Sequence, residues 1–261
     1  MRLDVFLCER GLARSREAAK RLITEGFVTV GGRTVTRPAY GVCEGDCVEA
    51  QTDGYVGRGA YKLKKAAEVF GLYLTGLICG DFGASTGGFT QVMLQCGAKR
   101  VYAVDVGHGQ LAAELAADDR VINMEGVNIK DVSPEVFPGG LDFAAADLSF
   151  ISLGCAVPVI SRVLKPGGRT VMLIKPQFEC GRENVGKKGV VRSRKVHIDV
   201  ISRIYGLFRE NGLAVMGLDF SPIKGGDGNI EYLIAGERGG KSMTFDIAGL
   251  VERAWEELND R

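Results

Sequence analysis

The sequence predicts an α/β protein: a mostly parallel sheet of seven strands with the last strand antiparallel, preceded by a small α+β module. From residue 60 onward, apolar strand-like runs alternate with helical patterns, which is typical of a parallel sheet with helices on both faces. Only the segment SPIKGGDGN separates the last two runs, and so short a connection does not allow a parallel crossover. A change of pattern near residue 50 predicts the separate module.

Residues 1–50 are predicted to form the small domain. LDVFLCERG and SREAAKRLITEG have the apolar spacing of two helices, the second with Ser15 as its N-cap and Gly26 as its stop. FVTVGGRTVTRP predicts a hairpin around two consecutive glycines, and a further short strand follows in YGVCEGDCVEA. Residues 51–59 are polar and rich in glycine, so we predict a linker there and a main domain over 60–261.

The main domain is predicted to begin with a helix in AYKLKKAAEVFGL. Strand-like runs follow at residues 77–82, 101–105, 120–124, 141–147 and 170–175. The helical patterns between them lie near residues 88–96, 109–117 and 151–164. A helix near 196–211 then precedes the strands LAVMGLDF and IEYLIAGE, of which the second is expected to run antiparallel.

Composition indicates a globular protein with a proper core. Of the 261 residues 46% are hydrophobic and 25% charged, and 33 Lys and Arg nearly balance 32 Asp and Glu. The charged start argues against a signal peptide, and no run of about 20 apolar residues predicts a membrane span. The seven cysteines are scattered without a C-x-x-C pair and there are two histidines, so we expect no disulfide framework and no metal site. We therefore predict a reduced, cytoplasmic protein.

Two segments carry an excess of positive charge. Residues 1–40 hold eight basic and four acidic residues, and residues 182–195 hold six basic residues and one acidic residue. Such clusters are either solvated faces or contacts for a polyanion, and on charge alone the solvated face is the simpler interpretation. If the partner is RNA, the candidate contacts are Arg14, Arg16, Lys20, Arg21, Arg33, Lys187, Lys188 and Arg192.

The turn DFGASTGGFT, residues 81–90, follows the first strand of the main domain, where nucleotides bind in such folds. A phosphate-binding loop would need lysine where Phe89 stands, and a dinucleotide fingerprint would need glycine where Ser85 stands. S-adenosylmethionine has an amine, a carboxylate and a ribose but no phosphate. Asp81 suits its amine, and the helix N-terminus near Gly88 suits its carboxylate. A turn needed only for packing of helix on strand is the alternative.

An acidic residue also ends the second strand. Asp105 is placed to bind the ribose hydroxyls of a cofactor, although dehydrogenases place an acid there too. The residues predicted to bind the cofactor are Asp81, Gly83, Ala84, Ser85, Thr86, Gly87, Gly88, Phe89, Asp105, Val106, Asn128 and Asp147.

Ionisable residues are predicted to meet at one edge of the sheet. Asp147 and Lys175 end neighbouring strands, Glu231 opens the antiparallel strand, and Lys62 on the first helix can reach the same edge. Any one of them is explained as an ordinary charge at a strand end. Together they suit methylation of a ribose 2′-hydroxyl, for which a lysine of lowered pKa would accept the proton.

Other methyl transfers fit the sequence less well. Methylation of amino groups on bases commonly uses N-P-P-Y or D-P-P-Y where this chain has DLSF. Methylation of a pyrimidine carbon needs an activated cysteine, and Cys180 has no basic partner near it in the sequence.

Taken together, these motifs resemble a known family. ARSREAAKRLITEGFVTVGGRTV resembles the S4-like RNA-binding domain, and the remainder resembles the FtsJ-type ribose methyltransferases. DFGASTGGFT, VDVGHGQL, DLSFISL, IKPQFE, VGKKGVVR and FSPIKGGDGNIEYL are similar to motifs of the TlyA family, often labelled hemolysin A, over nearly the whole chain. Lys130 stands where the family pattern has arginine.

The resemblance implies a Rossmann-like, S-adenosylmethionine-dependent methyltransferase fold. It also implies 2′-O-methylation of cytidine in ribosomal RNA of the 16S or 23S type, with ribosomal RNA or ribosomal subunits as partners. The family's catalytic tetrad falls on Lys62, Asp147, Lys175 and Glu231. Two alternatives stay open: a non-catalytic RNA-binding or ribosome-assembly factor, and a membrane-active hemolysin. For the hemolysin, the sequence offers neither a spanning segment nor a strongly basic amphipathic helix.

Overall fold

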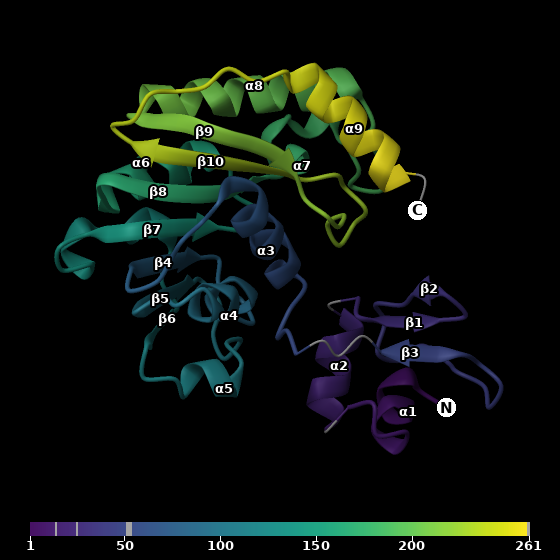
Figure 1. Ribbon diagram of the computed structural model, residues 1–261. Helices are drawn as coiled ribbons and strands as arrows, with labels where there is room; N and C mark the ends of the chain where they lie inside the picture. Colours follow the sequence, from purple (N-terminus) through teal and green to yellow (C-terminus); the bar gives the residue numbers. More distant parts are fainter. Residues whose placement is uncertain (14, 25, 51–53, 260–261) are drawn as a thin grey trace. The chain divides into compact units, whose positions relative to one another are not determined.

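A computed structural model describes residues 1–13, 15–24, 26–50 and 54–259. The chain separates into two compact units, Met1–Arg58 and Gly59–Arg261 (Figure 1). Residues 51–53 of the predicted linker lie outside the described part of the chain.

The N-terminal unit packs two helices on a three-stranded antiparallel sheet of order β2-β1-β3. The amide of Ala18 donates to Ser15 Oγ, which gives the second helix the cap that the sequence predicts. A single apolar cluster joins helices and sheet, with Leu3, Leu7 and Ile23 fully buried in it. The elements are α1 (Leu3–Glu9), α2 (Arg16–Thr24), β1 (Val28–Val30), β2 (Arg33–Thr34) and β3 (Val48–Ala50).

The larger unit is built on a seven-stranded sheet of order β6-β5-β4-β7-β8-β10-β9. Strand β10 is antiparallel to both of its neighbours, and the pairs among β4 to β8 are parallel. The predicted fold class, with its antiparallel last strand, is confirmed. The strands are β4 (Ile78–Phe82), β5 (Arg100–Asp105), β6 (Val121–Glu125), β7 (Leu141–Ala146), β8 (Leu164–Ile174), β9 (Leu213–Phe220) and β10 (Tyr232–Arg238).

Helices cover both faces of this sheet (Figure 1). On one face α6, α8 and α9 enclose the main apolar core with Phe82 and Ile174 from the sheet. On the other face α3 packs against α4, and β4 is linked to α4 by hydrogen bonds from Thr90 to Asp81. The helices are α3 (Gly59–Phe70), α4 (Gly88–Gln95), α5 (Ala113–Ala116), α6 (Leu153–Val163), α7 (Pro176–Glu179), α8 (Arg194–Glu210) and α9 (Ile247–Asn259).

Three elements differ from the sequence-based expectation. The helix expected near 109–117 shortens to α5, because the carboxylate of Glu125 accepts the amides of residues 109–111 and holds them in a loop. Strand β8 begins at Leu164, before the predicted start. Helix α9, absent from the prediction, packs against α8 and β9.

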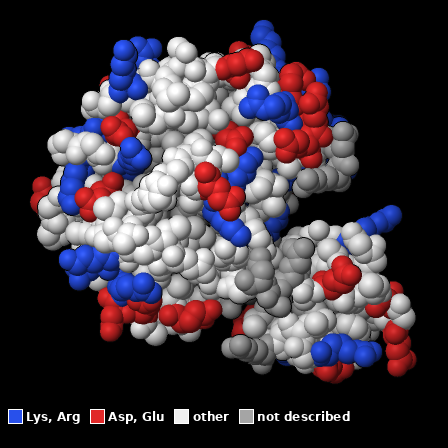
Figure 2. Space-filling view, in the orientation of Figure 1, with Lys and Arg blue, Asp and Glu red and all other residues white. Residues whose placement is uncertain are grey.

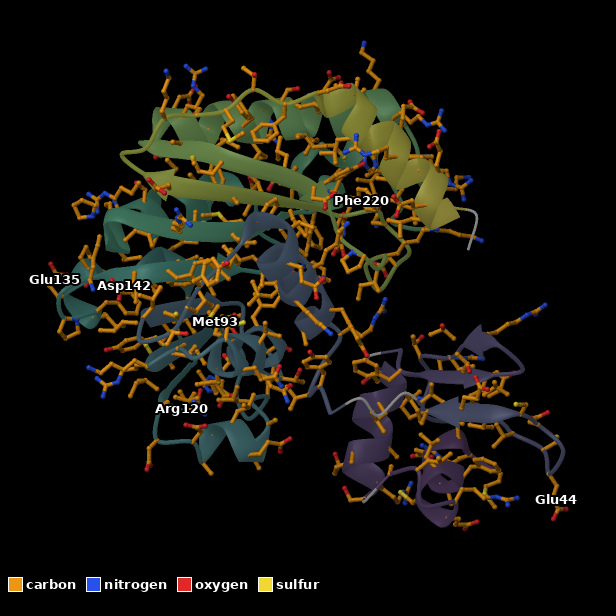
Figure 3. All side chains as sticks on the ribbon, in the orientation of Figure 1. Glu44, Met93, Arg120, Glu135, Asp142 and Phe220 are labelled. Atoms are coloured by element: carbon orange, nitrogen blue, oxygen red, sulfur yellow. The ribbon has the colours of Figure 1, made fainter. Side chains whose placement is uncertain are left out.

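The sheet register brings the antiparallel strand to the site-bearing edge. Tyr232 pairs with Ile174, so Glu231 enters β10 where Lys175 leaves β8. Two residues labelled in Figure 3 mark the opposite ends of the strands. Asp142 is the second residue of β7, at the amino end, and Phe220 is the last residue of β9, at the carboxyl end.

A buried histidine lies between α8 and β10. His197 is fully buried, with Nδ1 2.9 Å from the Tyr232 hydroxyl, Nε2 3.1 Å from the Val191 carbonyl, and the ring of Trp255 edge-on at 4.4 Å. The guanidinium of Arg194 lies over the ring of Trp255. Burial lowers the pKa of His197 from its ordinary 6.5 to about 4.

This histidine should make stability depend on pH. Between pH 6.5 and 4, His197 is protonated in the unfolded chain but stays neutral in the folded protein. The free energy of unfolding therefore falls as pH falls through this range, by up to about 3 kcal/mol. We expect His197→Gln, which can pair with the same two oxygens, to flatten this decline in thermal melts at pH 4 to 7. His108→Gln, at the exposed second histidine, should leave the decline unchanged.

Candidate active site

Two lysines and two carboxylates from four separate elements meet at the carboxyl edge of the sheet. Lys62 Nζ lies 3.0 Å from Asp147 Oδ2 and 2.8 Å from Glu231 Oε2, and Lys175 Nζ lies 2.7 Å from Asp147 Oδ1. All four side chains are largely buried, Asp147 being the most open at 15%. The structure thus brings together the four residues of the predicted tetrad, and we call this cluster the rim.

A second lysine on the helix of Lys62 contacts the end of β9. One turn further along α3, Lys65 Nζ donates to the carbonyl of Phe220 at 2.7 Å and pairs with Asp219 at 3.2 Å. The same ammonium lies 3.7 Å from the centre of the Phe220 ring. These contacts tie α3 to the end of β9.

The formal charges of the rim balance, and the surroundings of Lys62 and Asp147 keep these two groups ionised. Burial acts to lower the pKa of Lys62, but the carboxylates of Asp147 and Glu231 outweigh it and the net shift is upward. Burial acts to raise the pKa of Asp147, and the two lysines outweigh it, lowering that pKa to about 2. The predicted lysine of lowered pKa is therefore not Lys62, because its neighbours stabilise the ammonium.

Ser149 belongs to the rim although the sequence did not single it out. Lys175 Nζ donates to Ser149 Oγ at 3.0 Å, and the ring of Phe178 lies 5.8 Å away. The serine stands two residues after Asp147 in the loop that follows β7. That spacing within DLSF was the available signal, but a serine in a loop is too common to be selected without coordinates.

A cavity of about 500 Å³ opens beside the rim, and Asp147 lines both. Its walls come from the ends of β4, β5 and β7 and from the loops that follow them. Of the residues predicted to bind a cofactor, six line this cavity: Gly83, Ser85, Asp105, Val106, Asn128 and Asp147. Residues outside the prediction also line it, among them Gln110, Lys130 and Phe150.

The glycine-rich turn owes its shape to backbone that other residues adopt poorly. Gly83 has φ of +84°, and a Cβ there would lie 2.7 Å from the carbonyl oxygen of Asp147. Gly87 has φ of +95°, and a Cβ there would lie 2.3 Å from Leu115. Ser85 holds φ of +46° while its amide donates to Asp105 at 2.8 Å. The turn therefore passes close to both neighbouring strands.

The remaining residues of the predicted turn do not line the cavity. They are Asp81, Ala84, Thr86, Gly87, Gly88 and Phe89. Asp81 is fully buried: one carboxylate oxygen accepts the amide and hydroxyl of Thr90, and the other has no hydrogen-bond partner in the described part of the chain. Burial raises the pKa of this carboxyl to about 7.

Asp105 is more engaged than the sequence suggested. One of its oxygens accepts the Ser85 amide at 2.8 Å, and the other accepts the Gly107 amide at 2.7 Å. Each carboxylate oxygen has two acceptor positions, so Asp105 can shape the turn and still accept a hydroxyl from the cavity. Asn128 similarly uses Oδ1 to accept the amide of Lys130.

The predicted RNA contacts lie in both units. In the N-terminal unit Arg16 pairs with buried Asp4, Lys20 pairs with Glu17, and Arg33 is exposed on β2. Arg14 and the side chain of Arg21 lie outside the described residues. In the larger unit the exposed candidates are Lys187, Lys188 and Arg192. Figure 2 shows basic and acidic groups interspersed on the face drawn.

Among the described residues no group of three or more His, Cys, Asp or Glu side chains is arranged to hold a metal ion. Within the same part of the chain, every helix is too short or too polar to span a bilayer.

The parallel sheet with antiparallel β10, the glycine-rich turn after β4 and the cavity beside it define a Rossmann-like methyltransferase fold. The chain belongs to the FtsJ-like methyltransferase family, which its residues 55–238 match. Residues 1–48 match the S4 domain.

Relatives extend over nearly the full chain. The Bacillus subtilis protein YqxC, assigned as a candidate rRNA methyltransferase, is 44% identical over all of this chain and 96% of its own length. The Mycobacterium tuberculosis 16S/23S rRNA (cytidine-2′-O)-methyltransferase TlyA is 41% identical over 89% of this chain and 88% of its own. A solved structure of a candidate hemolysin from Streptococcus thermophilus superposes with a TM-score of 0.80 at 42% identity, covering 100% of this chain and 97% of that one.

Proposed function

We propose that this protein transfers a methyl group from S-adenosylmethionine to the 2′-hydroxyl of a cytidine in ribosomal RNA. The observation that carries the proposal is the position of Asp147, which pairs with both lysines of the rim and also lines the cavity. The activity named for the Mycobacterium tuberculosis relative supports the choice of reaction and acceptor. The S4 match supports RNA as the substrate, with residues 1–50 as the candidate binding module.

The residues around the glycine-rich turn fit S-adenosylmethionine. Asp105 lines the cavity and can still accept a hydroxyl, whereas Asp81, which the sequence assigned to the amine, is fully buried and does not line it. Gly83 leaves room that a Cβ would fill. When bound, S-adenosylmethionine supplies an electrophilic methyl group on a positively charged sulfur.

The rim would act on the acceptor hydroxyl. The Lys62 ammonium can stabilise the negative charge that develops on the 2′-oxygen as its proton leaves, and Asp147 keeps both lysines in place. Since the pKa of Lys62 is raised, Lys175 is the candidate proton acceptor of the two amines. Alignment can contribute about 7–11 kcal/mol, whereas general-base help contributes about 10²–10⁴ in rate. We therefore assign the larger part of the rate enhancement to positioning of the hydroxyl rather than to proton removal.

Mapping of 2′-O-methyl groups tests the proposal. Ribosomal RNA from cells with and without the gene should differ at one or a few cytidines in 16S or 23S RNA, and the purified protein should restore them from S-adenosylmethionine. Lys175→Ala should restore none. An unchanged map, or full restoration by Lys175→Ala, would refute the proposed function or the proposed site, respectively.

Glu125 should influence cofactor affinity without touching the reaction. Its carboxylate accepts three backbone amides of residues 109–111, which lowers its pKa to about 2 and fixes the loop that brings Gln110 to the cavity. We expect Glu125→Gln to raise the Kd for S-adenosylmethionine about tenfold, because an amide cannot accept all three bonds. Calorimetry measures the Kd, and kcat at saturating cofactor should stay the same. Glu135→Gln, at an exposed acid labelled in Figure 3, is the matched control.

A further inference from the structure

An exposed turn between α7 and α8 presents two lysines. The Gly186 amide donates to the Val190 carbonyl at 3.1 Å, and the Gly189 amide donates back to Gly186 at 2.8 Å. Lys187 and Lys188 form the exposed tip of this turn and make no ion pair with any residue that the structure describes. We call residues 186–192 the basic loop.

Buried side chains hold the base of the basic loop. The Val191 amide donates to Asn229 Oδ1 at 3.0 Å, and Asn229 Nδ2 donates to the Gly189 carbonyl at 2.8 Å. The Val191 carbonyl lies 3.1 Å from His197 Nε2. Asn229 and His197 are both fully buried. Both backbone polar groups of Val191 are thus fixed by side chains from outside the loop.

Asn229, and Tyr232 which bonds to His197, stand on either side of Glu231 in the sequence. Asn229 stands two residues before it, and its carbonyl accepts the Gly225 amide at 2.9 Å. Tyr232 stands one residue after it and bonds to His197 Nδ1 at 2.9 Å. Because a carbonyl only accepts, His197 Nε2 carries the proton and Nδ1 accepts from the tyrosine hydroxyl. The basic loop is therefore connected to both sides of the rim's glutamate.

We propose that Asn229 and His197 are positioning residues for the RNA substrate, and this rests on the proposed function. They hold the basic loop in one arrangement, so that Lys187 and Lys188 meet a phosphate of the RNA strand whose ribose enters the rim. A mobile loop would lose backbone conformational freedom on binding, and a loop whose backbone is ordered in advance avoids that loss. A fixed loop backbone also restricts which ribose along the strand reaches Lys175.

A double-mutant cycle tests this coupling. Asn229→Ala removes two hydrogen bonds to the basic loop, so we expect kcat/KM for ribosomal RNA to fall about tenfold through KM. The double variant Lys187→Ala/Lys188→Ala should itself lower the salt dependence of RNA binding by about two phosphate contacts. When Asn229→Ala is added to this double variant, we expect kcat/KM for ribosomal RNA to fall by less than about twofold. The Kd for S-adenosylmethionine should be the same in all four proteins.

Trypsin gives a readout that does not depend on activity. It cuts after lysine, so Asn229→Ala should be cleaved at Lys187 and Lys188 several times faster than the parent, and RNA should protect the parent. Tyr232→Phe removes only the hydroxyl that bonds to His197 Nδ1. It should lower kcat/KM for ribosomal RNA and speed trypsin cleavage as Asn229→Ala does, but by smaller factors. It serves as the second variant if Asn229→Ala does not fold.

The outcomes separate the two proposals. Suppose that the parent methylates ribosomal RNA. If the effects of Asn229→Ala and of the lysine substitutions on kcat/KM then multiply independently, or if Asn229→Ala lowers kcat rather than raising KM, the positioning role is wrong. Asn229 would then act through Glu231 or through general stability. Equal trypsin cleavage of parent and variants would overturn it as well. If the parent methylates no RNA, the proposed function itself fails.

Discussion

Asp147→Asn is expected to lower kcat by about 10³-fold or more. The substitution removes the charge that lies 3.0 Å from Lys62 and 2.7 Å from Lys175, and leaves two buried lysines with one carboxylate, Glu231, which contacts Lys62. A hydroxyl placed there would meet lysines that repel each other rather than a fixed pair. Single-turnover methylation of ribosomal RNA, with stoichiometric enzyme, measures the loss.

Stability separates the charge effect from simple damage. Removing one partner of a buried ion pair typically costs about 3–5 kcal/mol, so Asp147→Asn should melt at a lower temperature. Adding Lys62→Met restores the balance of charge in the rim and should recover much of the melting temperature. Activity should not return. Recovery of activity in that double variant would show that the tetrad is a structural ion cluster.

Lys62→Met is the second substitution for which we expect a large effect, about 10²–10³ in kcat. The methionine keeps the apolar stem, but Glu231, which is 2% exposed, loses the ammonium at 2.8 Å. Because the pKa of Lys62 is raised, this lysine is charged throughout the neutral range and does not set the pH dependence. The pH profile of the residual rate between pH 6 and 9 should therefore keep the shape of the parent's.

Lys65→Met is the matched control on the same helix. Lys65 contacts Phe220 and Asp219 outside the rim and is 20% exposed, so its loss should reduce kcat less than about fivefold. A comparable collapse in both variants would mean that displacement of α3, rather than the charge of Lys62, causes the defect. A shifted pH profile in Lys62→Met would instead identify Lys62 as the proton acceptor.

The elements that were predicted well are those whose pattern is local. Five parallel strands and the antiparallel pair follow from apolar runs and from one short connection, and the turn at 81–90 follows from its glycines. The helix at 109–117 was overestimated because a carboxylate sixteen residues away, Glu125, holds Gly109 and its neighbours in a loop. Helix α9 was missed although Leu250 and Ala254 bury its inner face.

The candidate site shows the same division. Strand ends placed Asp147, Lys175 and Glu231 at one edge before any coordinates, because parallel strands share that edge and the antiparallel strand begins there. The sequence did not reveal which turn residues face the cavity: Gly83 and Ser85 line it, whereas Phe89 is buried away from it. Backbone dihedrals decide this, and a glycine-rich string is compatible with many of them.

The sequence alone determined the class of fold, the position of the glycine-rich turn and the strand ends that carry Asp147, Lys175 and Glu231, because each depends on periodicity or on position relative to a strand end. Only the tertiary structure decided how those residues share charge, that Ser149 joins them, and that Asn229 and His197 fix the basic loop. These contacts join segments up to 169 residues apart, as between Lys62 and Glu231. Their geometry depends on how buried surfaces pack, which no local pattern encodes.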